Sequence, residues 1–301
     1  MTTIHILGSG TPAPTHDRFG SSYVIDTGES MVMLDCGPGA TAKAAMAGID
    51  VTAIDAVFLT HHHYDHSVDL PCMLMTRWDH EVPGSEPMRI HGPAPTVDLV
   101  DGITGVKGIF RHDVRARSEH PSSQRIYQMR GGSLPRPEPR WNTSDLEPGS
   151  VVKGNGWTVT AARAAHVQPF HESLAYRFDT AETSIVITGD TARCSEVTEL
   201  AKGADTMLCC CWDHHDGDDQ IDECVAEGMV GNMCGPEDAA LMATEAGVTR
   251  LVLVHHTPSV AQPGPAARAL EIAQENFSGE VIFAHEGLRI EDLATAHSSA
   301  R

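Results

Sequence analysis

Short apolar segments rich in valine and isoleucine alternate along the chain with longer alanine-rich segments. The short segments predict β-strands and the longer ones predict helices. Strands are expected near Ile4–Leu7, Tyr23–Ile25, Met31–Leu34, Ala56–Leu59, Met88–His91, Thr158–Ala161, Ser173–Arg177, Ser184–Ile187, Thr206–Leu208, Leu251–Val254 and Val281–Phe283. Helices are expected near Ala40–Ala47, Val68–Trp78, Pro95–Val106, Ser195–Ala201, Pro236–Ala246 and Pro265–Glu275. This alternation indicates an α/β fold.

The segment from Lys107 to Val152 departs from the alternation. It is rich in Arg, Pro, Gly and Ser and has little apolar periodicity. Long segments of this kind are lids, binding arms or plain surface insertions. Its arginines suit an anionic substrate group or an acidic partner subunit; they are Arg111, Arg115, Arg117, Arg125, Arg130, Arg136 and Arg140. We therefore predict one domain over residues 1–301, with a lid or interface insertion at 107–152.

The overall charge of the chain is strongly negative. Lys and Arg number 21 and Asp and Glu number 41, which gives a formal net charge of −20. Nucleic-acid-binding proteins need a basic surface to neutralise phosphates, so a nucleic-acid partner is not expected. No run reaches the roughly 18 apolar residues of a membrane span. The N-terminus has no signal-peptide pattern, so we expect a cytoplasmic protein with no membrane partner.

Cysteine use fits a reducing compartment. The chain has eight cysteines and no visible export signal, so reduced thiols are expected. Cys209, Cys210 and Cys211 are consecutive and end an apolar stretch. Because free cysteine behaves as a small hydrophobic residue, we interpret them as a buried strand end.

A dense group of metal-binding side chains follows the strand that ends at Leu59. Within six residues the chain carries His61, His63, Asp65 and His66. Residues two apart in an extended segment face the same side, so His61 and His63 can point at one ion. Asp65 and His66 begin the next element and can serve a second ion. Imidazole and carboxylate are donors that Zn²⁺ accepts, and strand ends are where sites gather in α/β folds.

Three more candidate ligands each follow an apolar strand. They are His166, Asp190 and His255. A carboxylate such as Asp190 can bridge two ions and hold them about 3.5–4 Å apart. The seven side chains together predict a dinuclear metal site.

These residues resemble the metallo-β-lactamase superfamily and, within it, the ribonuclease Z and arylsulfatase-like branch. The motifs that carry the resemblance are His61-x-His63-x-Asp65-His66, the Leu7–Pro14 opening, Asp35-Cys36-Gly37, Leu174–Arg177, Thr188–Thr191, and Gly235–Ala240 leading into Leu251–His255. The resemblance covers nearly the whole chain except residues 107–152. It implies a four-layer αββα sandwich with a dinuclear zinc site at one edge.

The same resemblance assigns the ligands. One zinc ion would be bound by His61, His63 and His166, and the other by Asp65, His66 and His255, with Asp190 bridging them. Mn or Fe would also suit these donors. Because the branch is commonly dimeric, a homodimer is expected.

The chain also departs from the ribonuclease Z pattern. Cys209–Trp212 stand where that family has His-Glu-Ala-Thr, so its glutamate is missing. Met233–Gly235 stand where it has His-Ser-Thr, so the histidine expected to assist the leaving group is missing. His166 and Asp190 are close in sequence, which leaves no room for the family's long tRNA-gripping arm. With the negative charge, these departures favour another substrate.

We therefore expect a dinuclear zinc hydrolase of activated small molecules, such as esters, lactones, aryl sulfates or aryl halides. A metal-bridging hydroxide would attack the electrophile, with Asp65 orienting it and accepting its proton. His214 is the candidate proton donor to the leaving group. One alternative is a phosphodiesterase or ribonuclease Z-like RNA 3′-processing enzyme. Another is a non-catalytic metal or ligand sensor.

Overall fold

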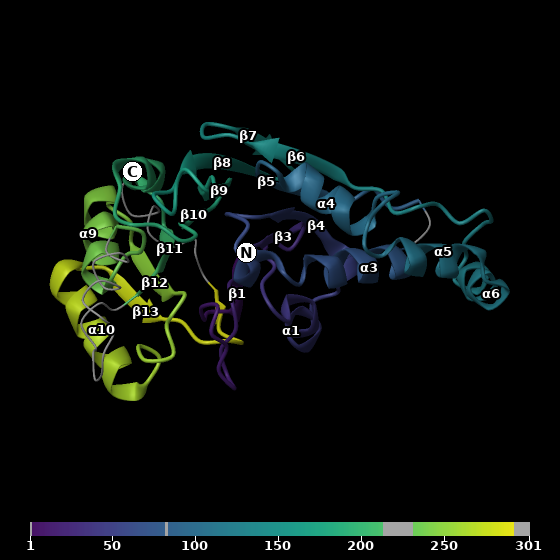
Figure 1. Ribbon diagram of the computed structural model, residues 1–301. Helices are drawn as coiled ribbons and strands as arrows, with labels where there is room; N and C mark the ends of the chain where they lie inside the picture. Colours follow the sequence, from purple (N-terminus) through teal and green to yellow (C-terminus); the bar gives the residue numbers. More distant parts are fainter. Residues whose placement is uncertain (1, 82–83, 213–230, 292–301) are drawn as a thin grey trace.

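The computed structural model describes residues 2–81, 84–212 and 231–291. Two seven-stranded mixed sheets pack face to face, and helices cover the outer face of each sheet (Figure 1). The result is four layers in the order helix, sheet, sheet, helix. This architecture confirms the predicted αββα sandwich.

The first sheet comes mainly from the N-terminal half of the chain. Its order is β14 (Arg289–Ile290), β1 (Thr3–Gly8), β2 (Ser22–Asp26), β3 (Met31–Leu34), β4 (Ile54–Phe58), β5 (Arg89–Pro93) and β6 (Asn142–Leu146). Its outer face packs against α1 (Ala40–Met46), the short η1 (Val51–Ala53), α3 (Leu70–His80) and α4 (Thr96–Thr104). The strands from β3 to β6 are parallel, so their carboxyl ends share one edge.

The second sheet comes from the C-terminal half. Its order is β13 (Glu280–Phe283), β12 (Arg250–Val254), β11 (Thr206–Cys210), β10 (Ser184–Ile187), β9 (Leu174–Thr180), β8 (Trp157–Arg163) and β7 (Val151–Lys153). Its outer face is covered by α7 (Ser195–Ala201), α9 (Pro236–Ala246) and α10 (Pro263–Asn276). None of the helices within the described ranges combines the length and the hydropathy of a transmembrane span.

A continuous apolar core joins the two sheets. Phe58 of the first sheet contacts Tyr176 and Trp157 of the second, with ring centroids 5.4 and 6.0 Å apart. All three side chains are buried. Large aromatic side chains dominate the energetics of such cores. This packing holds the edges of the two sheets together, and the candidate site lies at one of these edges.

Residues 107–152 contain regular structure that the apolar pattern did not predict. They form α5 (Arg111–Glu119), α6 (Pro121–Met129) and β6. Only Val114 is buried on α5 and no residue is buried on α6, so neither helix shows an apolar stripe. Local contacts stabilise them instead, including i,i+4 ion pairs of Arg115 with Glu119 and of Arg117 with Asp113. The two helices project from the first sheet, away from α9 and α10 (Figure 1). A lid or interface role remains a prediction.

Candidate metal centre

Four of the candidate ligands lie on the loop and short helix that follow β4. The loop residues His61 and His63 are two apart, and the following helix α2 (Tyr64–Ser67) carries Asp65 and His66. His61, Asp65 and His66 are almost completely buried at the junction of the two sheets. Six consecutive residues, on one loop and one short helix, therefore place four donor side chains close together.

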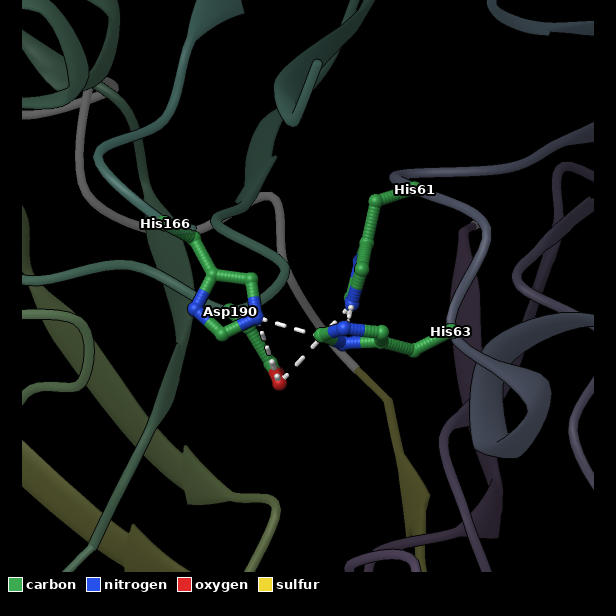
Figure 2. Close-up of side chains that lie close together, drawn as sticks. All are labelled: His61, His63, His166 and Asp190. Carbon is green, nitrogen blue, oxygen red and sulfur yellow. Dashed lines mark hydrogen bonds and ion pairs between the residues drawn. The ribbon is translucent and has the colours of Figure 1, made fainter. Parts of the chain in front are cut away.

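His61, His63, His166 and Asp190 form the first of two clusters (Figure 2). One donor atom from each lies within 4.8 Å of the donor atoms of the others. His63 Nδ1 is 2.9 Å from His61 Nε2 and 3.3 Å from His166 Nε2. Asp190 Oδ2 is 3.8 Å from His166 Nε2 and 4.0 Å from His61 Nε2. The four side chains point toward a common centre.

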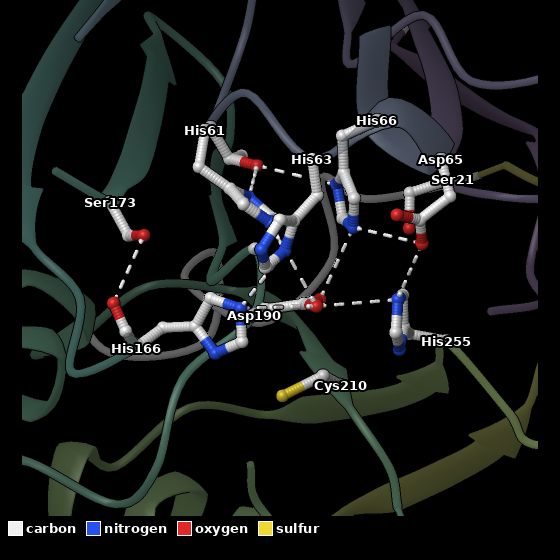
Figure 3. Close-up of polar contacts among 12 residues, drawn as sticks. Ser21, His61, His63, Asp65, His66, His166, Ser173, Asp190, Cys210 and His255 are labelled. Carbon is white, nitrogen blue, oxygen red and sulfur yellow. Dashed lines mark hydrogen bonds and ion pairs between the residues drawn. The ribbon is translucent and has the colours of Figure 1, made fainter. Parts of the chain in front are cut away.

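Asp65, His66 and His255 form the second cluster, beside the first (Figure 3). Asp65 Oδ2 is 3.2 Å from His255 Nε2 and 3.6 Å from His66 Nε2. Asp190 reaches this cluster as well, because its carboxylate oxygens lie 3.4 Å from His66 Nε2 and 3.4 Å from His255 Nε2. Asp190 thus stands between the clusters, where one carboxylate can serve two ions.

The three ligands of the second sheet come from the ends of β8, β10 and β12. Asp190 follows Gly189, whose φ of +58° lies in the left-handed region. A Cβ at Gly189 would lie 2.7 Å from Thr60 Cβ, so only glycine lets this turn pack against the His61 loop. His255 also has a positive φ, of 57°. These left-handed turns aim the two side chains back toward the first sheet.

Asp35 orients one of the histidines, although the sequence assigned it no role at the site. Its fully buried carboxylate accepts a hydrogen bond from His66 Nδ1 at 2.7 Å. The Thr60 N–H and hydroxyl donate to the same carboxylate at 2.7 and 2.9 Å. Because a carboxylate accepts only, the proton of His66 is on Nδ1 and Nε2 faces the centre. The sequence did contain a signal for this role, because Asp35 directly follows β3, at the carboxyl end of a parallel strand.

Asn232 plays the corresponding part for His166. Its backbone carbonyl accepts a hydrogen bond from His166 Nδ1 at 2.9 Å, and its side-chain oxygen accepts one from the Val167 N–H at 3.0 Å. Nε2 of His166 is thereby left facing Asp190. No local pattern marks Asn232, which lies 66 residues beyond His166.

The electrostatics of the centre attract positive charge. Burial lowers the pKa of His61 well below its usual value, so this imidazole is neutral. Burial opposes ionisation of Asp190, but His255 and His66 outweigh it and hold the pKa of the carboxyl well below its usual range. Burial also opposes a charge on His66, yet Asp190 and Asp35 raise its pKa well above 6.5. A cation binding here would replace that proton.

The donor atoms fit a pair of metal ions. Asp65 Oδ1, His66 Nε2 and Asp190 Oδ1 are buried and make no hydrogen bond. Buried polar atoms without partners are costly, and metal coordination would satisfy these three. Imidazole and carboxylate donors suit Zn²⁺, and also Mn and Fe. The two His/Asp clusters therefore suggest a dinuclear metal site.

A cavity of about 640 Å³ opens beside the two clusters. His63, His166 and Asp190 reach into it, and Trp212 and Met233 form part of its wall. The cavity gives a substrate access to the candidate ligands. His214, the predicted proton donor, lies outside the described residues, so its role remains a prediction.

Comparisons with known proteins agree with this geometry. The family model described as a Beta-lactamase superfamily domain matches residues 30–256. Ribonuclease Z of Mycobacterium bovis (strain BCG / Pasteur 1173P2) is 29% identical over 296 residues, covering 97% of this chain and 98% of that protein. The metallo-beta-lactamase fold protein YhfI from Bacillus subtilis superposes with a TM-score of 0.72 at 19% identity, covering 97% of this chain and 99% of its own. Human tRNase Z, short form, gives a TM-score of 0.64 at 20% identity, covering 96% and 98%.

Two predictions from the sequence are wrong in the light of these comparisons. The prediction of a small-molecule substrate and the prediction that nucleic acid is not a partner are both contradicted, because a relative that matches almost the whole chain is named ribonuclease Z. The comparisons support the ribonuclease Z-like alternative instead. The net charge of −20 misled because it is a sum over the whole chain and does not report where charges lie. Residues 107–140 carry eight Lys or Arg against three Asp or Glu, a local excess of five positive charges.

Proposed function

The chain belongs to the beta-lactamase superfamily and is a metal-dependent hydrolase, and on that premise we propose that it cleaves phosphodiester bonds of RNA in 3′-end processing. The observation that carries this proposal is the match, over almost the whole chain, to a protein named ribonuclease Z. The convergence of seven metal-binding side chains beside an open cavity supports it.

We assign the ligands by cluster. His61, His63 and His166 would hold one Zn²⁺ ion and Asp65, His66 and His255 the other, with Asp190 shared between them. When bound, two such ions supply the Lewis acidity that activates water and neutralises the negative charge of a phosphodiester. We also propose that the protein forms a homodimer, as expected from the sequence.

The chain's own residues provide positioning and proton transfer. Asp35 holds His66 with Nε2 toward the centre, and the Asn232 carbonyl does the same for His166. Asp65 Oδ2 contacts His255 Nε2 at 3.2 Å, whereas its Oδ1 makes no hydrogen bond. We propose that this carboxylate, besides serving as a metal ligand, orients an attacking water molecule and accepts its proton.

Trp212 supplies a surface suited to single-stranded RNA. It is only partly buried, lies two residues after the end of β11, and lines the cavity with His63 and His166. Proteins recognise unpaired bases by stacking them on aromatic side chains. We propose that a base next to the cleaved bond stacks on Trp212. The exposed positive residues of 107–140, such as Arg125 on α6, would contact more distant phosphates.

The decisive experiment compares substrates on one metal-loaded preparation of the full chain. We expect cleavage of an RNA that carries a 3′ extension, and much weaker turnover of 4-nitrophenyl acetate. His61→Ala should abolish RNA cleavage. His62→Ala is the matched control, because His62 Nε2 bonds to Thr96 Oγ1 at 2.9 Å and is not part of either cluster. Strong ester hydrolysis without RNA cleavage would refute the proposal.

Replacing Trp212 tests the stacking surface separately. Stacking of one base contributes about 1–3 kcal/mol, so Trp212→Ala should raise KM for RNA by roughly 5- to 150-fold. Trp212→Phe should recover most of the loss because it keeps an aromatic face. Hydrolysis of bis(4-nitrophenyl) phosphate, which has no base to stack, should change little. Equal losses on both substrates would assign Trp212 a structural role instead.

A further inference from the structure

Three cysteine side chains converge behind the His/Asp clusters. Cys209 and Cys210 end β11, and Cys234 lies just before α9. Their sulfur atoms all lie within 4.8 Å of one another. Exposures of 0%, 1% and 0% place all three in the core. The proposed cleavage of RNA uses none of them.

The backbone holds the two segments that carry these thiols in place. The Trp212 N–H donates to the Cys234 carbonyl at 2.8 Å, and the Cys211 N–H donates to the Val254 carbonyl at 2.8 Å. Cys209 and Cys210 are neighbours in sequence, yet both sulfurs reach Cys234. The three sulfurs therefore form a preorganised set and are not cysteines scattered singly through the core.

We propose that Cys209, Cys210 and Cys234 bind one monovalent copper ion, separate from the ions of the His/Asp clusters. Thiolates are soft ligands, which favour Cu(I). Structural zinc sites are instead almost always tetrahedral with four protein ligands. Within the described ranges, no further His, Cys, Asp or Glu joins this cluster. Three sulfurs thus match Cu(I) better than Zn²⁺.

Binding at this site is a coordination step without electron transfer. Copper enters as Cu(I), forms bonds to sulfur, and displaces thiol protons, which leave to solvent. Cys210 would exchange its contact with the Thr191 carbonyl, 3.3 Å from its sulfur, for the metal ion. The negative charge that develops on sulfur lies just before α9, whose N-terminus is the positive end of the helix dipole.

The cysteine cluster and the His/Asp clusters differ in donor type but are close in space. Cys210 lies beyond Asp190 as seen from His61 and His63 (Figure 3). Thr191, which contacts Cys210, directly follows Asp190 in the chain. Nitrogen and oxygen donors on one side and sulfur donors on the other would sort two classes of metal ion at adjacent positions.

Copper retention by the full chain tests the site. The protein, already loaded at the His/Asp clusters, is given Cu(I) without oxygen and challenged with a colorimetric Cu(I) chelator. We expect one copper ion per chain to be retained, with the content of the other metal unchanged. Cys210→Ser and Cys234→Ser should each weaken the retention of copper by more than about 100-fold. This is more than the loss expected from removing a residue that only hydrogen-bonds to a ligand.

Two control variants make the result specific. Cys211→Ser changes an equally buried cysteine next to the cluster, and Cys72→Ser removes an exposed thiol. Both should retain copper like the unmodified chain. Equal loss in Cys211→Ser and Cys234→Ser would overturn the proposal, because it would indicate general damage to the core.

X-ray absorption at the copper edge tests the coordination without any variant. We expect three sulfur neighbours. Nitrogen or oxygen neighbours, or release of one resident ion for each copper bound, would place copper in the His/Asp clusters and refute the site. Neither measurement uses RNA cleavage, so a failure to bind copper and a failure to cleave RNA are separate outcomes.

Discussion

The two sheets contribute to one centre in different ways. The first sheet provides four donors from residues 61–66, directly after β4. The second provides His166, Asp190 and His255, one after each of β8, β10 and β12. These three strands run in the same direction, so their carboxyl ends meet at one edge. One half of the centre is therefore a local motif, and the other half exists only through strand order and register.

This difference predicts where the centre is most vulnerable. In the first half, each donor sits beside others that share its loop. In the second half, each donor depends on its own turn, and the Asp190 carboxylate lies within 4.0 Å of histidines of both clusters. A single change at Asp190 should therefore affect the whole centre.

The largest effect is expected for Asp190→Asn. Loss of the shared charge should lower the affinity for both ions by more than about 100-fold. This is more than the loss expected from replacing a residue that only hydrogen-bonds to a ligand. Elemental analysis should find fewer metal ions per chain, and RNA cleavage should fall accordingly. Asp98→Asn, a change at an exposed carboxylate on α4, is the control. Full metal content in Asp190→Asn would show that the two halves bind independently.

A smaller effect is expected for Asp35→Asn, which acts only through the first half. The amide cannot take over the charged hydrogen bond to His66, so the orientation of Nε2 is weakened. Metal affinity should fall about 10- to 100-fold. Competition with a chelator measures this, with the same Asp98→Asn control. If Asp35→Asn lowered metal affinity as much as Asp190→Asn does, Asp35 would matter as much as a ligand and could not be a residue that only orients His66.

The pH dependence of the free energy of unfolding tests the first sheet alone, through His91 on β5. Burial, followed by the charge of Arg89, lowers the pKa of His91 to about 4, and its Nδ1 bonds to Ser144 Oγ at 2.7 Å between β5 and β6. Because the unfolded chain takes up this proton near pH 6.5, folding stability falls as pH drops from there toward 4. The loss between pH 7 and pH 5 should be about 2 kcal/mol.

Urea unfolding at the two pH values measures the effect. His91→Gln should remove this part of the pH dependence, while the rest of the protein's titration remains. The first sheet would then carry a pH-sensitive link at the edge from which α5 and α6 project. An unchanged pH dependence in the variant would assign the loss to other groups.

The smallest effect concerns the remote positive charges of α5 and α6. If α6 contacts phosphates, Arg125→Ala should weaken RNA binding a few-fold and reduce the slope of log affinity against log salt by about 1. Lys202→Ala removes an exposed positive charge next to α7, on the second half, and should leave the slope unchanged. Identical salt slopes for both variants would exclude the α5–α6 region from the RNA path.

Local patterns in the sequence predicted the elements that have an apolar face. The strands Met31–Leu34 and Ser184–Ile187 and the helices Ser195–Ala201 and Pro236–Ala246 have the predicted bounds. The helices α5 and α6 escaped because they bury almost nothing, so no periodicity marks them. The prediction that nucleic acid is not a partner failed for a related reason. It rested on the net charge of the chain, which does not say where the positive side chains lie.

The sequence by itself determined the alternating strands and helices and the row of donors at 61–66, since both depend on neighbours a few residues apart. Tertiary structure decided the rest. It brought Asp190 within reach of both clusters, set Asp35 behind His66, and gathered Cys234 with Cys209 and Cys210. These contacts join residues that lie far apart in the chain. They arise from sheet order, parallel strand direction and packing between layers, none of which is contained in local periodicity.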